Sequence, residues 1–263
     1  MQRHERIDGG RTTLVIAAGE TGAPRLLYFG TRLSGGADLA EIEAALRVGP
    51  RESTPDVPVP ASLYPPGGMG WFGEPAISGL HDGGDGALSW SSCAIERRGE
   101  AVCVTLIDRR TKLRALLNFR MDASTGVLSA FSIVHNDGST PFRLQQAASL
   151  CLPLPSWATE IQTFEGDWSR EAQPVRIPAP PGAWSRTNRT GRTGFAGSTF
   201  AVLEPGAGDQ TGRVVNVHLA WSGDHRLMVE TLPSGQRVAM AGAHLAPGEI
   251  VVQPGAAFET PTA

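Results

Sequence analysis

The residues best suited to recognition chemistry are aromatic and basic side chains in two stretches rich in turn-forming residues. The first covers residues 63–76 and contains the adjacent pair Trp71 and Phe72. The second covers residues 166–193 and combines tryptophans with arginines. Rigid aromatic rings and planar guanidinium groups dominate the energetics of docking surfaces. The candidate docking residues of the second stretch are Trp168, Arg170, Trp184, Arg186, Arg189 and Arg192.

Aromatic rings of this kind also suit carbohydrate binding. Indole faces stack on the apolar C–H faces of sugars, while arginine and acidic side chains hydrogen-bond sugar hydroxyls. Glycines on either side of Trp71 and Phe72 predict an exposed indole, so we assign ligand binding to this pair. For Trp168 and Trp184 two interpretations stay open: they contact a ligand or a partner, or they pack loops onto the sheets.

Other kinds of site find little support in the sequence. The six histidines lack the spacing of metal ligands, and we expect no metal or cofactor. The segment HDGGDG, with His81, Asp82 and Asp85, is compatible with a calcium loop, but turn chemistry explains its composition. Asn188 begins a glycosylation sequon that we interpret as chance. The sequence has no GxSxG, P-loop, HExxH or CxxC motif, and no GxGxxG motif that follows a strand.

Composition narrows the class of protein further. The 263 residues carry a net charge of −3, which predicts no phosphate-binding basic face and no nucleic-acid partner. The apolar run 14–18 is far shorter than the ~20 residues that span a bilayer, so we expect no membrane partner. Cys93, Cys103 and Cys151 lie in apolar segments; a hairpin could pair the first two, but buried thiols are favoured. The odd count and the missing signal peptide predict a cytoplasmic protein.

Short apolar runs separated by turns indicate a β protein. The 32 glycines and 20 prolines punctuate many such runs. One surface helix is expected over residues 38–47, with Asp38 as its N-cap. The proline-rich residues 50–86 predict a long ordered loop. We expect strands at 12–18, 25–30, 88–95, 101–108, 113–121, 127–135, 142–152, 199–203, 214–222, 226–232, 236–241, 249–253 and 256–260.

This number of strands exceeds an ordinary immunoglobulin-sized sandwich. The economical architecture is one large two-sheet β-sandwich that occupies residues 1–263 as a single domain.

An ordered series of motifs gives the chain a family resemblance. The segments LYPPGGMGWFGEPA (63–76), GDWSRE (166–171), SRTNRTGRT (185–193) and VHLAWSGDHRLMVE (217–230) resemble the amino-terminal domain of glycoside hydrolase family 36, the bacterial α-galactosidase family. The closing LAPGEIVVQPGAAFETP (245–261) is similar to the strands that precede the catalytic barrel of that family. The resemblance covers essentially the whole chain.

The resemblance implies a β-supersandwich fold, like that of galactose mutarotases, followed by a (β/α)8 barrel. It implies that two barrel aspartates cleave terminal α-galactosides with retention, a reaction that needs a nucleophile and an acid/base. Neither aspartate motif occurs in residues 1–263, so we expect the barrel after residue 263 and an inactive isolated chain. The implied partners are this barrel, α-galactoside sugars and further copies of the same subunit.

The resemblance also gives the proline-rich loop a role, because in oligomeric members this loop reaches a neighbouring subunit's pocket. The chain departs from the family loop at Trp71, where aspartate is usual, and at Gly73, where arginine is usual. Trp71 is then expected to replace polar contacts by stacking.

Two other functions compete with this interpretation. A free-standing carbohydrate-binding sandwich would use Trp71 and the segment 166–193 as its surface. A mutarotase-like epimerase would need an acid and a base that face one sugar, drawn from His218 or His225 and a nearby glutamate.

Overall fold

Nearly all regular secondary structure is β-strand in the computed structural model, which describes residues 3–46, 59–84 and 86–263. The first ten strands are β1 (Arg3–Gly9), β2 (Thr12–Ala18), β3 (Arg25–Thr31), β4 (Ile77–His81), β5 (Ser92–Arg98), β6 (Ala101–Asp108), β7 (Leu113–Met121), β8 (Leu128–Asn136), β9 (Phe142–Ala147) and β10 (Leu150–Leu154). The remaining strands are β11 (Glu160–Asp167), β12 (Arg170–Pro178), β13 (Gly182–Asn188), β14 (Thr199–Leu203), β15 (Val214–His218), β16 (His225–Thr231), β17 (Arg237–Ala243), β18 (Ile250–Val252) and β19 (Ala257–Glu259). The helix α1 spans Leu39–Ala45.

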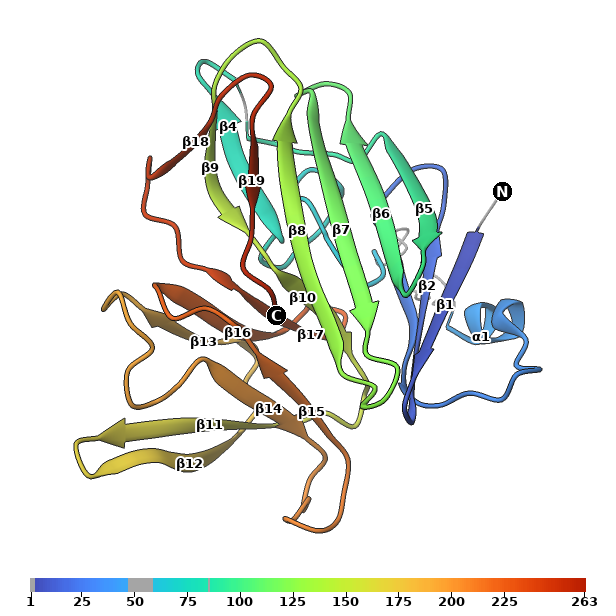
Figure 1. Cartoon of the computed structure of the whole chain (residues 1–263), viewed down its shortest axis with the longest axis vertical. Coiled ribbons are helices and arrows are strands. Elements are labelled where there is room, and N and C mark those ends of the chain that lie inside the picture. Colours follow the sequence, from blue (N-terminus) through green and yellow to red (C-terminus); the bar gives the residue numbers. More distant parts are fainter. Residues whose placement is uncertain (1–2, 47–58, 85) are drawn as a thin grey trace.

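The strands form five antiparallel sheets. Their orders are β1-β2-β3, β19-β8-β7-β6-β5, β18-β9-β4, β10-β17-β16-β13 and β12-β11-β14-β15. Figure 1 shows the long meander β5–β8 beside β1 and β2 in one half of the molecule, and the sheets of β11–β17 in the other half. The β11–β12 hairpin projects from this second half, so its tip lies far from the meander.

One hydrophobic cluster joins these sheets. It contains Ile7 of β1, Leu106 of β6, Phe142 of β9, Val202 of β14 and Val252 of β18, all of them buried. Strands such as β7 alternate buried and half-buried residues, the pattern of a sheet with one face in a core. The structure therefore confirms the all-β fold class. The described strands form several separate hydrogen-bonded sheets rather than the two expected ones.

The sequence pattern located many strands well and missed several others. The expected boundaries of β2, β6, β7 and β14 agree with the structure, whereas β1, β4, β11, β12 and β13 were not expected as strands. β1 has a polar sequence, and β12 is exposed along nearly its whole length, so neither shows the alternation of a half-buried strand. β4 lies within the region expected to be a loop, of which residues 50–58 and 85 fall outside the described residues.

The one described helix forms where expected. The Asp38 side chain accepts hydrogen bonds from the backbone N–H groups of Ala40 and Glu41, which caps α1. Leu39 and Ile42 pack against a small cluster on β2 and β3. Residue 47, the expected end of the helix, lies outside the described residues.

The cysteines are free and buried, as favoured from the sequence. The register of β5 and β6 places Cys93 opposite Leu106, and Cys103 opposite Glu96. This offset puts the two thiols on opposite faces of the sheet, which prevents a disulfide. No helix in the described ranges is long and apolar enough to cross a membrane.

We predict that core burial on β6 dominates stability. Val104 on β6 is 0% exposed, whereas Val214 on β15 is 56% exposed. Val104→Ala should lower the free energy of unfolding by about 2 kcal/mol, because it removes buried methyl groups and leaves a cavity. Val214→Ala, the same change on an exposed strand position, should cost less than about 0.5 kcal/mol. Urea denaturation followed by circular dichroism measures both, and equal losses would contradict the assignment of the core.

Candidate functional site

The proline-rich loop lies against the sheet β10-β17-β16-β13. Its residue Ala61 donates a backbone hydrogen bond of 3.2 Å to Oε1 of Gln236, in the turn that precedes β17. Further along the loop, Trp71 packs with Ala61, with Leu232 from the end of β16 and with Val238 of β17. Ala61 and Trp71 of the loop are therefore held in place by residues from the C-terminal third of the chain.

The two aromatic residues of the loop point in different directions. Trp71 is only 7% exposed, whereas Phe72 is 82% exposed. The expectation of an exposed indole was wrong, because the glycines beside Trp71 let the loop turn its ring onto Leu232 and Val238. The indole Nε1 donates a 2.9 Å hydrogen bond to the backbone carbonyl of Glu74. Trp71 therefore anchors the loop, and Phe72 is the ring that the loop presents to solvent.

Gly73 fits this arrangement because it has no side chain. A Cβ atom at this position would lie 2.5 Å from Cδ2 of Leu232, 2.7 Å from Oε2 of Glu230 and 3.1 Å from Nε1 of Trp71. All three distances are shorter than or at the limit of ordinary carbon contacts. Residue 73 is therefore enclosed mainly by the side chains of Leu232 and Glu230, with the indole nitrogen of Trp71 at the edge of the same space.

Charged residues of β16 complete the site. The Glu74 carboxylate accepts a 2.7 Å hydrogen bond from Nη1 of Arg226, and the Glu74 backbone N–H donates to Oε2 of Glu230 at 2.8 Å. Arg226 and Glu230 lie on the same face of β16, since residues at even spacing share a face. Sequence reasoning missed these residues. The available signal was that these two charged residues flank the apolar run Leu227–Val229 within β16.

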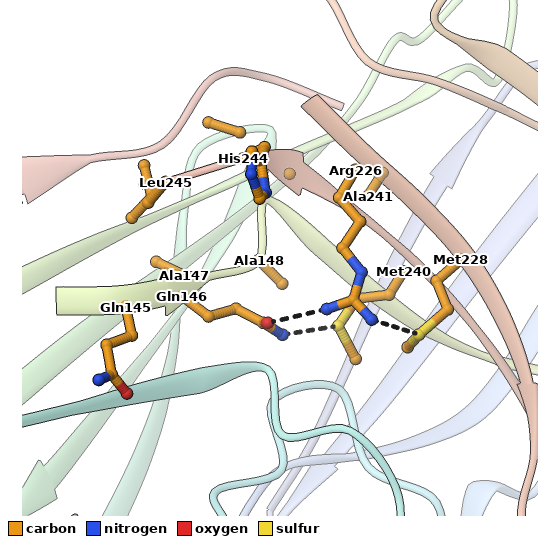
Figure 2. A pocket seen from close by; sticks show the side chains of 12 residues that line it. Gln145, Gln146, Ala147, Ala148, Arg226, Met228, Met240, Ala241, His244 and Leu245 are labelled. Atoms are coloured by element: carbon orange, nitrogen blue, oxygen red, sulfur yellow. Dashed lines mark hydrogen bonds between the residues drawn. The ribbon is translucent and has the colours of Figure 1, made fainter. Parts of the chain in front are cut away.

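A small hollow opens beside this ion pair (Figure 2). It measures about 130 Å³, and its floor includes Met228 and Met240. Figure 2 shows the guanidinium of Arg226 pointing toward the amide of Gln146, with the two methionine sulfurs close by. Arg226 donates to Oε1 of Gln146 at 3.3 Å, and Gln146 donates to the carbonyl of Pro75 at 2.6 Å. The hollow therefore combines an apolar floor with hydrogen-bonding groups that are already partly paired. Its lining also includes Gln145, His244 and Leu245.

The tryptophans of the stretch 166–193 are separated by the fold. Trp168 lies at the turn between β11 and β12 and is 80% exposed. Trp184 of β13 faces the neighbouring sheet instead, with its ring centroid 5.6 Å from that of Phe200 on β14. Of the two open interpretations, core packing describes Trp184, whereas Trp168 is free to contact a partner.

The arginines of this stretch are also distributed. Arg186 donates from Nη1 to the carbonyl of Phe164 on β11, and burial lowers the pKa of its guanidinium. Arg170, Arg189 and Arg192 are exposed at strand ends and loops. Asn188 uses its side-chain amide to hold the loop after β13, through the carbonyls of Arg192 and Thr193. The docking role of these residues therefore stays a prediction.

The histidines do not form a reaction centre in the part of the chain that the structure describes. His225 is buried and its Nδ1 lies 2.9 Å from the carbonyl of Gly223, whereas His218 is exposed on a different sheet. A buried His225 cannot face a sugar, so the epimerase interpretation loses one of its two histidines. His81 contacts the carbonyls of Thr111 and Thr140, and Asp82 pairs with Arg143. Asp85 lies outside the described residues.

The family model described as the glycosyl hydrolase family 36 N-terminal domain matches residues 22–253. The chain belongs to this family, which confirms the resemblance seen in its sequence.

Its relatives are α-galactosidases. The chain is 30% identical to an α-galactosidase of Escherichia coli over 207 residues, which cover 78% of the chain and 29% of the relative. It is 25% identical over 167 residues to a probable α-galactosidase G of Aspergillus terreus, covering 60% of the chain and 23% of that relative. The chain therefore spans less than a third of the length of these curated relatives.

Solved structures show the same fold. The family 36 α-galactosidase AgaA of Geobacillus stearothermophilus superposes with a TM-score of 0.82 at 21% identity, over 100% of this chain and 40% of that one. The α-galactosidase of Lactobacillus brevis superposes with a TM-score of 0.82 at 22% identity, over 99% of this chain and 38% of that one.

We predict that Gly73 tolerates no side chain while Gly67 does. Gly73→Ala should cost about 1–3 kcal/mol of unfolding free energy, because its methyl group must displace Glu230 from Glu74 and crowd Leu232. Gly67, in the same loop, has no atom within 4 Å of the point that a Cβ would occupy, and Gly67→Ala should be neutral or stabilising by up to about 1 kcal/mol. Guanidinium denaturation of the two variants tests this difference. Indistinguishable stabilities would show that the loop is not packed as described.

Proposed function

We propose that this chain is the non-catalytic domain of an α-galactosidase-type enzyme that hydrolyses terminal α-galactosides. The observation that carries the proposal is the match of nearly the whole chain to the family domain, combined with relatives named α-galactosidases of which it spans under a third. In this proposal a barrel outside residues 1–263 supplies the reacting carboxylates. The β-sandwich supports that barrel and contributes subunit contacts.

The chemistry of the described hollows supports an inactive isolated domain. Retaining hydrolysis needs two carboxyl groups about 5–5.5 Å apart around the scissile bond. The hollow beside Arg226 has no aspartate or glutamate in its lining. A second hollow, between β11, β12, β14 and the β14–β15 connection, has Asp209 as its one acidic lining residue. Neither hollow offers the carboxylate pair that the reaction requires.

Phe72 is the candidate substrate contact of the domain. The Phe72 ring is exposed to solvent, whereas Trp71 before it is packed against β17 and Gly73 after it is closely surrounded by other side chains. We propose that in the assembled enzyme this ring lines the substrate pocket, across a boundary between subunits. In this proposal Trp71 anchors the loop that carries the ring and makes no direct sugar contact. The exposed Trp168 is assigned to a domain or subunit interface.

A free-standing sugar-binding module is the second candidate. The exposed ring of Phe72 favours it, because Phe72 lies two residues before Glu74, which pairs with Arg226 in the lining of the hollow. Titration calorimetry of the purified chain with galactose, melibiose and raffinose separates the two functions. Saturable binding at millimolar concentration or tighter, lost in Phe72→Ala and retained in Phe195→Ala, would favour the module. Absence of binding favours a domain whose pocket needs the rest of the enzyme.

The activity prediction compares the isolated chain with the full-length enzyme. The 263-residue chain should release no galactose from an aryl α-galactoside, and the full-length product of the coding sequence should do so with saturation kinetics. A colorimetric assay of equimolar samples measures both. Saturable release by the chain alone would refute the non-catalytic role, and a full-length product without α-galactosidase activity would refute the assigned reaction.

The substrate-contact prediction concerns Phe72 in that enzyme. Phe72→Ala should raise KM about two- to tenfold with little change in kcat, because it removes an aromatic contact that the substrate makes in both ground and transition states. Phe195→Ala, which truncates another partly exposed phenylalanine of this domain, should leave both constants unchanged. Unchanged kinetics in Phe72→Ala would remove this residue from the substrate pocket.

A further inference from the structure

The loop around Phe72 holds a large apolar ring in water, which an unconstrained loop would avoid. The ring is 82% exposed while its neighbour Trp71 is 7% exposed. Burial of a phenylalanine is worth about 1.5–3 kcal/mol relative to exposure, so a loop free to rearrange would fold the ring onto the surface. Specific contacts of residues 71–75 are therefore expected to hold Phe72 in its exposed position.

Glu74 is the centre of these contacts, because three of its polar groups are engaged. Its carbonyl accepts from Nε1 of Trp71 at 2.9 Å, and its backbone N–H donates to Oε2 of Glu230 at 2.8 Å. Its carboxylate accepts from Nη1 of Arg226 at 2.7 Å. A residue with backbone and side chain both fixed cannot rotate without breaking at least one of these hydrogen bonds. Phe72 lies between Trp71 and Glu74, and both of these residues are held, so the backbone at Phe72 has little freedom to move.

The partner of Glu74 is itself fixed by two other strands. Arg226 contacts Oε1 of Gln146 on β9 at 3.3 Å and Oγ of Ser185 on β13 at 3.3 Å. Gln146 also donates to the carbonyl of Pro75, the residue after Glu74, at 2.6 Å. The guanidinium thus has a defined orientation before it meets the loop, and a planar group held in this way pairs with a carboxylate at small entropic cost.

We propose that Trp71, Glu74, Arg226 and Glu230 form a clamp that sets the direction of Phe72, and that Arg226 and Glu230 are positioning residues for the substrate contact. The inference rests on the proposed function only in assigning substrate to Phe72. The clamp itself follows from the three hydrogen bonds of Glu74. Because the clamp acts through Phe72 and not through the reacting carboxylates, its loss should change KM and leave kcat nearly unchanged.

A spin label at position 72 tests the clamp directly. The native cysteines are buried, and burial raises the pKa of the Cys93 thiol to about 11, so Phe72→Cys can be labelled selectively in the 263-residue chain. Because position 72 is exposed, the label keeps its own side-chain rotation and reports the clamp as a difference in mobility. It should be more mobile in Arg226→Gln and Glu74→Gln than in the parent background. Arg226→Lys should reverse part of this increase, since one nitrogen carries the contact to Glu74.

Controls separate the clamp from general loosening. Arg213→Gln removes a comparable pair, the 2.6 Å contact to Glu204 beside β15, and should leave the mobility of the label unchanged. Circular dichroism must show folded protein for each variant, and Glu74→Gln, a near-isosteric change in the loop, serves if Arg226→Gln does not fold. Unchanged mobility of the label in folded Arg226→Gln and Glu74→Gln overturns the proposal.

The kinetic test uses the full-length enzyme. Arg226→Gln should raise KM about two- to tenfold, and it should add nothing in a Phe72→Ala background, because both changes remove the same contact. Additive effects of the two changes overturn the positioning role. If the label becomes mobile while neither Arg226→Gln nor Phe72→Ala changes KM, the clamp is supported and the assignment of Phe72 to the substrate pocket is refuted.

Discussion

Burial of apolar side chains between sheets is the interaction on which the rest of this structure depends. Each sheet has only three to five strands, and a sheet of that size cannot cover its own apolar face. The shared cluster solves this problem with residues from both ends of the sequence, such as Ile7 and Val252. Leu63 and Tyr64 of the proline-rich loop belong to the same cluster, so the core also anchors the segment that carries the candidate site.

Much of the fold could be predicted from local patterns, and the exceptions have physical reasons. β7 buries an apolar residue at every second position because one face of its sheet is in the core, and the boundaries of β6 and β7 were predicted correctly. The β11–β12 hairpin lacks such a pattern because β12 is solvated on both faces. β4 was obscured by the prolines and glycines before it, and its antiparallel pairing with β9 is interrupted by a register shift between Ser78 and Gly79.

The site was predicted only in part, because it depends on contacts between distant segments. The sequence identified the pair at 71 and 72 but could not tell which ring would be exposed. That outcome depends on Leu232 and Val238, whose position beside the loop follows from the tertiary fold. The charged partners Arg226 and Glu230 look like ordinary polar positions of a strand until the fold places Glu74 against them.

The close approach at Gly73 couples this loop position to the end of β16. A Cβ there would lie 2.5 Å from Cδ2 of Leu232 and 2.7 Å from Oε2 of Glu230, whereas the indole nitrogen of Trp71, at 3.1 Å, would have to move only slightly. A larger residue at position 73 therefore needs a compensating change at position 230 or 232. Substitutions at these three positions are epistatic although the loop and the strand are far apart in the sequence.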